Sequence, residues 1–285
     1  MTTLLRAPVE YRRACEEARA ASRRVGLVPT MGALHAGHLS LIEEAARRCD
    51  FVVVTVFVNP LQFGAGEDLD RYPRTLERDL EACRAHGVNV VFAPERDAMY
   101  PRAFQSSVRV GDLTKPLEGE FRPEHFDGVT TVVTKLFNLT GSCTAVFGRK
   151  DYQQWTILRR MVRDLDMPID VIGCPIVREP DGLAMSSRNR YLSAHDRTRA
   201  LSIVEGLRAV HDAWGQGEYS AHTLEKVVAA PVIAAFDRVD YVAVVDADTL
   251  EPASPDAERL LVAVAAHLGS TRLIDNVVLG EDPRP

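Results

Sequence analysis

The chain has 285 residues, of which 46% are hydrophobic and 26% charged, a composition typical of globular proteins with one large domain or two smaller ones. The formal net charge of −6 disfavours non-specific binding to nucleic acid, so an anionic ligand would need a local cluster of positive groups. The N-terminus lacks the apolar segment of a signal peptide, and no apolar run approaches the roughly 20 residues that span a bilayer. The five cysteines are scattered and form no C-x-x-C pair, which predicts free thiols in a reducing cytoplasm.

The first two-thirds of the chain alternates between strand-like and helix-like segments. Apolar, β-branched runs predict strands at 24–29, 51–58, 87–93, 145–148 and 169–177. Helical periodicity predicts helices at 39–48, 75–86, 128–139 and 151–164, although the Val and Thr content of 128–139 also permits a strand. Repeated βα units indicate a parallel sheet with right-handed crossovers, whose ligands bind at the carboxyl ends of the strands.

The pattern changes after Asn189. Helices are predicted at 194–214 and 220–236, and strand-like segments follow at 240–246, 259–267 and 272–279. Helices followed by strands favour a small α+β domain with an antiparallel sheet, and we place the hinge near 186–190. We therefore expect an α/β protein with two domains, 1–187 and 188–285. The Pro-rich end, EDPRP, is predicted to be a frayed tail.

The segment 27–42, LVPTMGALHAGHLSLI, is a strand, a turn with glycine and the start of a helix. Its core is His-x-Gly-His, in which His35 and His38 lie on the same face of the helix. The free N–H groups of a helix N-terminus suit an anion, and Gly32 and Gly37 let the backbone approach it closely. Two surface histidines at a helix start are the simpler alternative, but the whole unit favours phosphate. A zinc site is disfavoured because neither His-Glu-x-x-His nor a cysteine or carboxylate at ligand spacing is present.

Three further segments carry polar groups at the ends of predicted elements. FGRKDYQQ, at 147–154, places Lys150 at a helix N-terminus, although a solvated charged turn is an equal alternative. DGLAMSSRNR, at 181–190, could hold a triphosphate or could cap the following helix. FRPEHFDGV, at 121–129, reads as an ordered loop whose role the residues alone do not reveal. Neither a Walker A motif nor GxGxxG is present.

The chain resembles the pantothenate synthetase (pantoate–β-alanine ligase) family in six segments: VPTMGALHAGHLSLI, VFVNPLQFG, YPRT, FRPEHFDGV, KDYQQ and GLAMSSRNRYLS. The resemblance runs from about Val25 to Ser193, and GSTRLIDN extends it weakly into the C-terminal third. His-x-Gly-His alone indicates only the wider nucleotidyltransferase superfamily. The resemblance implies a Rossmann-like N-terminal domain, a smaller C-terminal lid and a homodimer. It also implies that the carboxylate of (R)-pantoate attacks the α-phosphorus of ATP, and that β-alanine then displaces AMP from pantoyl adenylate.

The resemblance also assigns residues to the substrates. At ATP it places Met31, Gly32, Ala33, Leu34, His35, Ala36, Gly37, His38, Gly148, Arg149, Lys150, Asp151, Val177, Met185, Ser186, Ser187 and Arg188. His38 matches the family's proton donor. Gln62 would hold both pantoate and β-alanine, and Gln154 would hold pantoate. Attack of a carboxylate on a polyanion needs positive charge, which makes His35, His38 and Lys150 the catalytic candidates. Mg²⁺ would reach the site on the phosphates of ATP, and no protein ligand for it is identified.

Two positions depart from the family's pattern. The family often has Glu where this chain has Arg149, and Gly where it has Glu124. Neither change removes a group that the chemistry needs. Two other functions remain as alternatives: a nucleotidyltransferase that acts on a phosphate ester, and a non-catalytic nucleotide-binding module. The segments NPLQFG and FRPEHFDGV disfavour the first, and the presence of the catalytic His and Lys disfavours the second.

Overall fold

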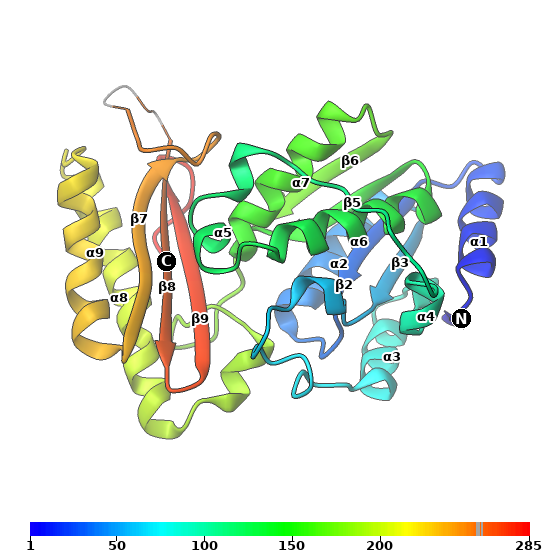
Figure 1. The fold of residues 1–285 in the computed structure, drawn as a ribbon, viewed down its shortest axis with the longest axis horizontal. Coiled ribbons are helices and arrows are strands. Elements are labelled where there is room, and N and C mark those ends of the chain that lie inside the picture. The colour runs from blue at the N-terminus through cyan, green and yellow to red at the C-terminus, as the bar shows by residue number, and fades with distance from the viewer. Residues whose placement is uncertain (255–256, 258) are drawn as a thin grey trace. The chain divides into compact units, whose positions relative to one another are not determined.

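The computed structural model describes residues 1–254, 257 and 259–285 (Figure 1). Contacts within the chain divide it into two units, and we describe each by itself. The first unit comprises Met1–Thr114, Arg122–Arg149 and Gln154–Cys174. The second comprises Lys115–Phe121, Lys150–Gln153 and Pro175–Pro285. Two short stretches from the middle of the chain therefore belong to the same unit as the C-terminal third.

A six-stranded parallel sheet organises the first unit, in the order β1-β4-β3-β2-β5-β6. Its strands are β1 (Thr3–Leu5), β2 (Val25–Thr30), β3 (Phe51–Val56), β4 (Val90–Phe92), β5 (Cys143–Gly148) and β6 (Ile169–Cys174). The central strands are buried on both faces, which explains their nearly continuous runs of Val, Leu and Phe. The parallel α/β sheet predicted from the sequence is confirmed.

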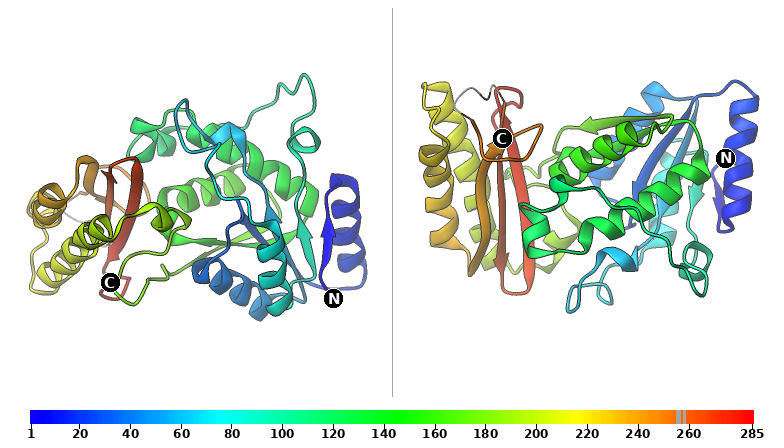
Figure 2. Two further views of the ribbon diagram at one scale, coloured as in Figure 1. Left: turned by 90° about the horizontal axis from the view of Figure 1, so that it is seen from below. Right: turned by 45° about the horizontal axis from the view of Figure 1, so that its top comes forward.

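Helices cover both faces of this sheet. The longer ones are α1 (Pro8–Ala20), α2 (Ala36–Arg48), α3 (Leu76–Ala85), α6 (His125–Thr140) and α7 (Tyr152–Asp164). Right-handed crossovers place α2 and α3 on one face and α1, α6 and α7 on the other (Figure 2). Shorter elements of the chain are α4 (Arg96–Met99), α5 (Glu118–Phe121) and the 3-10 turns Pro60–Gln62, Asp112–Thr114, Arg149–Asp151 and Ser187–Tyr191.

The ambiguous segment 128–139 lies within helix α6. Its buried residues Val129, Val132, Val133, Leu136 and Phe137 recur at spacings of three and four, which is the helical period. This apolar stripe outweighs the lower helix propensity of Val and Thr. The first strand and helix, β1 and α1, were not predicted. β1 is only three residues long, and α1 shows its apolar face at just three buried positions.

The second unit is built on the antiparallel sheet β7-β8-β9, formed by Arg238–Asp246, Leu260–Leu268 and Thr271–Leu279. Helices α8 (Ala194–Gly215) and α9 (Ala221–Ala235) pack on one face of it and bury a core of Ile, Leu and Val. This confirms the predicted α+β arrangement. The frayed tail was predicted wrongly, because Arg284 pairs with Asp212 and the carbonyl of Pro285 accepts a hydrogen bond from Arg208.

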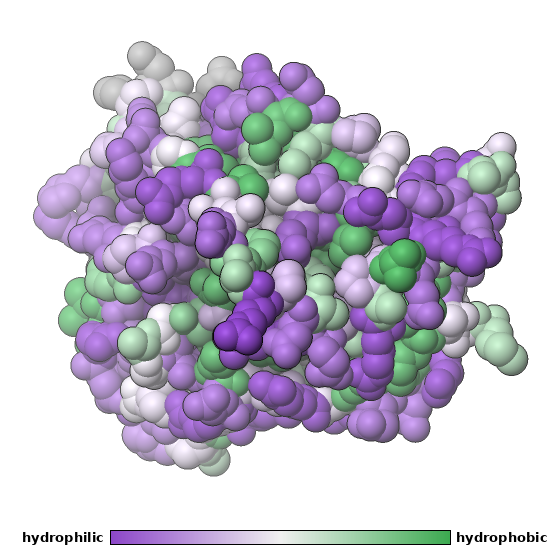
Figure 3. All heavy atoms as spheres, turned by 45° about the vertical axis from the view of Figure 1, so that its right-hand side comes forward, coloured by the Kyte–Doolittle hydropathy of each residue, from purple (hydrophilic) through white to green (hydrophobic). Residues whose placement is uncertain are grey.

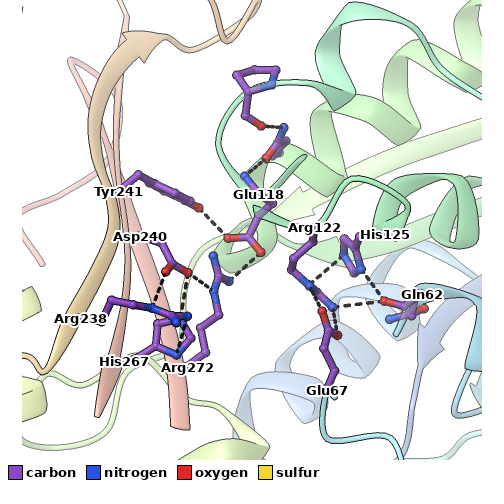
Figure 4. Close-up of polar contacts among 12 residues, drawn as sticks. Gln62, Glu67, Glu118, Arg122, His125, Arg238, Asp240, Tyr241, His267 and Arg272 are labelled. Atoms are coloured by element: carbon purple, nitrogen blue, oxygen red, sulfur yellow. Dashed lines mark hydrogen bonds and ion pairs between the residues drawn. The ribbon is translucent and has the colours of Figure 1, made fainter. Parts of the chain in front are cut away.

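Alternating residues of β9 serve the two faces of this sheet. Leu273 and Val277 face the helices, whereas Arg272 and Asn276 point to the other face. There Arg272 donates to Glu118 at 2.7 Å and to Asp240 at 2.7 Å, and Tyr241 also donates to Glu118, at 2.8 Å (Figure 4). These charged bonds attach the stretch Lys115–Phe121 to the sheet.

All five cysteines are free and buried. No helix in the described part of the chain is long and apolar enough to cross a membrane. On the face drawn in Figure 3, hydrophilic side chains predominate and hydrophobic ones occur in separate spots.

Candidate active site

The sheet of the first unit contains a switch point between β2 and β5. The chain proceeds from β2 toward one edge through β3 and β4, and from β5 toward the other edge through β6. β2 pairs with β3 along its whole length, but with β5 at Gly26 and Leu27. The carboxyl ends of β2 and β5 therefore diverge, which is the place where open parallel sheets bind ligands. The turn that begins at Met31 follows β2, and Arg149 follows β5.

The turn after β2 has left-handed backbone at two successive residues, which glycine adopts freely but alanine does not. Gly32 and Ala33 have φ angles of +85° and +52°, in the left-handed region. Asp79 of α3 holds the turn: its carboxylate accepts hydrogen bonds from the backbone N–H of Ala33 at 3.0 Å and of Leu34 at 2.9 Å. Asp79 is 1% exposed. A buried carboxylate thus aligns the peptide groups that precede the His-x-Gly-His pattern.

His35 and His38 cap the N-terminus of α2 reciprocally. The Nδ1 of His35 accepts from the N–H of Gly37 at 3.2 Å, and the Nδ1 of His38 accepts from the N–H of His35 at 3.4 Å. A neutral imidazole that accepts through Nδ1 carries its proton on Nε2. The two rings lie 4.1 Å apart. The arrangement gives two side-by-side imidazoles whose Nε2–H groups can donate to an anion at the start of the helix.

Gln62 lies after β3, and its side chain is oriented by neighbours. Its Oε1 accepts from Asn59 Nδ2 at 3.1 Å, and its Nε2 lies 3.3 Å from the sulfur of Met31. Asn59 is 1% exposed, and its Oδ1 accepts from the hydroxyl of Tyr100 at 2.8 Å. Two predicted site residues, Gln62 and Met31, are therefore in contact within the first unit.

The two glutamines of KDYQQ have different surroundings. Gln153 is 4% exposed, its Oε1 accepts from the N–H of Glu118, and its Nε2 donates to the carbonyl of Pro116 at 2.7 Å. Gln154, the predicted substrate ligand, is half-buried on the next position of α7. Gln153 thus has a structural partner in the backbone of 116–118, a role that the sequence analysis did not assign.

Lys150 belongs to the second unit, where its backbone is held by the sheet. Asn276 of β9 donates a hydrogen bond from Nδ2 to the carbonyl of Lys150 at 2.8 Å. Asn276 is 4% exposed and is the last residue of the GSTRLIDN segment. This contact gives the C-terminal motif a physical role in placing the lysine.

The segment from Val177 to Arg188 also belongs to the second unit. The N–H of Met185 donates to the carbonyl of Val177 at 3.0 Å, so two predicted ATP-binding residues face each other across a narrow loop. Ser186 caps the following 3-10 turn by accepting from the N–H of Arg188 at 3.2 Å. The helix that follows, α8, is instead capped by Ser193, whose hydroxyl accepts from the N–H of Asp196, so the predicted capping of that helix by residues 181–190 was wrong.

Asp79 was not predicted to belong to the site, and Asn59 was predicted to lie at the end of a strand without a role. Asn59 precedes a proline that opens a 3-10 turn, so the Asn-Pro pair was a readable capping signal. Asp79 carried no such signal because the backbone groups that it holds in the turn, those of Ala33 and Leu34, lie 46 and 45 residues earlier in the chain. Glu124, a departure from the family pattern, has φ −98°, which any residue adopts, so glycine is not needed there. Among the residues that the structure describes, no group of three His, Cys, Asp or Glu is placed to hold a metal ion.

Comparisons with known proteins agree with this architecture. Residues 3–278 match the family described as pantoate-beta-alanine ligase. The chain is 51% identical to pantothenate synthetase 1 of Bradyrhizobium diazoefficiens over 96% of its own length and 97% of that protein. A crystal structure of pantothenate synthetase from Thermus thermophilus superposes with a TM-score of 0.91 at 46% identity, covering 96% of this chain and 98% of that one. The pantoate-beta-alanine ligase of Francisella tularensis, solved with beta-gamma ATP and beta-alanine, has a TM-score of 0.80 at 29% identity and covers both chains fully.

Proposed function

This chain belongs to the pantoate–beta-alanine ligase family, and we propose that it joins (R)-pantoate to β-alanine through a pantoyl-adenylate intermediate. In the first step a carboxylate oxygen of pantoate attacks the α-phosphorus of ATP, and pyrophosphate leaves. In the second step the amine of β-alanine attacks the carbonyl carbon, and AMP leaves with the oxygen that had joined carbon to phosphorus. The ATP and beta-alanine bound in the Francisella tularensis relative support this choice of substrates.

The observation that carries this proposal is the reciprocal capping of His35 and His38. Because both Nδ1 atoms accept from backbone N–H groups, both rings offer Nε2–H donors at the N-terminus of α2. Negative charge builds up on the phosphate oxygens during adenylylation, and donors fixed before the reaction stabilise that charge most effectively. His38 donates to the phosphate in this mechanism, and His35 binds beside it.

The remaining proposed site residues divide by substrate. Gln62 and Gln154 bind pantoate, and Gln62 also meets β-alanine; neutral amides leave the attacking carboxylate more nucleophilic than a direct ion pair would. Lys150 compensates the charge of the phosphates as a compact cation. The nucleotide is bound by the segments assigned above: Met31–His38, Gly148–Asp151, Val177 and Met185–Arg188.

Mg²⁺ enters this proposal only as part of the ATP substrate. The described residues offer no carboxylate and histidine cluster that fits a resident ion, and no step here depends on one. Magnesium keeps most of its waters and commonly binds through substrate phosphates. We also propose a homodimer, as the resemblance to the family implies, and sedimentation at several concentrations would test it. The cytoplasmic location is proposed from the scattered cysteines, and the domains 1–187 and 188–285 from the change in sequence pattern near 186–190.

Exchange of labelled pyrophosphate into ATP tests the adenylate step alone. We expect exchange that depends on pantoate and needs no β-alanine. In the complete reaction, pantoate labelled with ¹⁸O in its carboxylate should transfer one labelled oxygen to AMP. Exchange without pantoate would indicate another nucleotidyltransferase, and labelled inorganic phosphate with ADP would indicate an acyl phosphate instead of an adenylate.

A further inference from the structure

The segment FRPEHFDG, which carries no role in the proposed mechanism, contacts the main chain of Gln62 from two side chains. His125 Nδ1 donates to the carbonyl oxygen of Gln62 at 2.8 Å, and Arg122 Nη2 donates to the same oxygen at 3.2 Å (Figure 4). Both residues belong to the first unit, as Gln62 does. One carbonyl oxygen thus receives two side-chain donors from residues 60 and 63 positions later in the chain.

The protonation of His125 is fixed by these contacts. Its Nδ1 must carry a proton because the carbonyl of Gln62 can only accept. Its Nε2 lies 3.3 Å from Arg122 Nη1, and a guanidinium can only donate. His125 is therefore the neutral Nδ1–H tautomer, and Arg122 holds the ring in the orientation that places Nδ1 on Gln62.

Glu67 orients Arg122 in turn. Its carboxylate receives Arg122 Nε at 2.7 Å and Nη2 at 2.6 Å, a paired geometry that fixes the plane of the guanidinium. The two side chains are 17% and 26% exposed, so water screens the pair less than at the open surface. Burial alone would raise the pKa of Glu67, but the bonds and charge of Arg122 outweigh it and keep that pKa below its usual value. We call Glu67, Arg122 and His125 the Gln62 clamp.

Close packing limits how far the clamped main chain can move. A Cβ atom at Gly128 would lie 2.2 Å from the carbonyl oxygen of Leu61 and 2.6 Å from the nitrogen of Gln62, so only glycine fits there. Asn59 Nδ2 donates to the carbonyl of Gly128 at 3.1 Å as well as to the side chain of Gln62. His125 and Gly128 lie three residues apart on one side of the first turn of α6, and Arg122 precedes that helix; all three contact the 61–62 stretch of main chain or would do so through a Cβ.

We propose that Arg122 and His125 are positioning residues for the pantoate step: they fix the main chain of Gln62, so that its amide is oriented before pantoate arrives. This inference rests on the proposed role of Gln62 as a pantoate ligand. A ligand-binding side chain on a 3-10 turn of three residues would otherwise sample several orientations, and ordering it would reduce affinity. The clamp removes that cost by bonds that do not touch the substrate.

The two nitrogens of His125 can be tested separately. The amide nitrogen of asparagine can occupy the place of Nδ1, whereas that of glutamine reaches the place of Nε2. We expect H125Q to raise the KM for pantoate about fivefold, as for one lost hydrogen bond, and to leave the KM for ATP and kcat unchanged. H125N should restore the KM for pantoate to within about twofold of the wild type. R122K keeps the charge but loses the paired geometry, and it should raise the KM for pantoate as H125Q does.

Two further variants separate positioning from general damage. R109A removes the more exposed ion pair between Arg109 and Asp127 of α6, at 2.9 and 2.6 Å, and should change no kinetic constant. The double variant Q62A/H125Q should have the KM for pantoate of Q62A alone, because His125 acts through Gln62.

Additive effects of Q62A and H125Q, or equal damage from H125N and H125Q, would refute the clamp while leaving the role of Gln62 intact. An unchanged KM for pantoate in Q62A would instead refute the proposed role of Gln62 and the clamp together. If H125Q does not fold, R122K provides the test. A KM for pantoate that is raised in R122K supports the clamp, and a KM equal to that of the wild type overturns it.

Discussion

Replacing Asp79 by alanine should show how much this side chain contributes to stability and how much to ATP binding. Asp79 holds the turn after β2, residues 31–34, which we call the nucleotide turn. The carboxylate of Asp79 accepts from the N–H groups of Ala33 and Leu34 at 3.0 and 2.9 Å, and the hydroxyl of Thr75 donates to it at 3.2 Å. Asp79 is 1% exposed, so water cannot simply replace it. The D79A variant leaves two backbone donors near the start of α2 without this acceptor, in a turn where Ala33 has φ +52°.

The expected cost follows from those two donors. A buried donor left without a partner costs about 1–3 kcal/mol, so the two donors together should cost D79A about 2–6 kcal/mol of stability. For a domain of this size, about 1 kcal/mol lowers the Tm by about 2–4 °C, which gives a decrease of at least about 4 °C. D79N keeps one acceptor oxygen but turns an N–H group toward the other donor, so it should lose about half as much. Both variants should also raise the KM for ATP, because the turn loses its fixed conformation.

Thermal unfolding followed by circular dichroism measures the stability, and pyrophosphate exchange measures the KM for ATP. The matched control is E81A, because Glu81 is exposed on the same helix, two residues after Asp79. A decrease in Tm no larger than that of E81A would show that the carboxylate does not hold the turn. A large decrease in Tm with an unchanged KM for ATP would show that it holds the turn but that the turn does not bind ATP.

The other predictions concern single steps of the mechanism or the pH dependence of stability. H38A should lower the rate of pantoate-dependent pyrophosphate exchange by about 10²–10³ and change ATP binding much less, as measured by single-turnover kinetics and calorimetry. K150R should restore little of the activity lost in K150A, because a planar guanidinium does not replace an ammonium; full activity in K150R would refute the need for a point charge. Q154A should raise the KM for pantoate alone, whereas Q153A should lower the Tm, because the Gln153 amide binds backbone groups. Burial alone would raise the pKa of Asp240, but hydrogen bonds from arginine and histidine hold that pKa below its usual value. The ionised carboxylate therefore stabilises the fold above about pH 4, and this contribution is lost as the pH falls through the lowered pKa of the folded state. D240N should therefore reduce stability at pH 7 and weaken the dependence of stability on pH below about pH 4. Thermal unfolding at a series of pH values measures this, and an equal loss of stability at every pH would contradict the assignment.

Local sequence patterns predicted the parallel sheet because each of its buried central strands is a short run of apolar residues. β3, Phe51–Val56, carries five residues with little exposure in a row, so the pattern needs no distant information. α6 was harder to predict, since Val and Thr favour strands, and the spacing of its buried residues decided the outcome. β1 could not be predicted, because a strand of three residues is stabilised by its pairing with β4, 87 residues away, and this pairing leaves no local signal.

In the candidate site, too, some residues have a local sequence signal and others depend on distant parts of the chain. His35 and His38 could be proposed from the sequence, because they follow a recognisable strand and have side chains suited to phosphate, whereas the resemblance to the family assigned Gln62. The groups that orient them could not be found in this way. Asp79 and Arg122 contact the turns from 45 and 60 residues further along the chain, and an isolated Asp or Arg is ordinarily a solvated surface charge.

This division has a physical reason that extends beyond these residues. Substrate-binding groups at the ends of parallel strands lie on turns, and a turn of three or four residues cannot fix its own side chains against the entropy of their rotamers. The fixation must come from groups anchored elsewhere in the chain, and here those groups are charged and shielded from solvent, fully for Asp79 and partly for the other pair: Asp79 in α3 holds the backbone of the nucleotide turn, and Arg122 with Glu67 holds the carbonyl of Gln62. A buried charge is costly unless its bonds are complete, so each of these groups tolerates few other positions of its partners. These charged groups come from distant parts of the chain, which makes them hard to recognise in the sequence. Their need for complete hydrogen bonds keeps the two turns rigid before substrate binds.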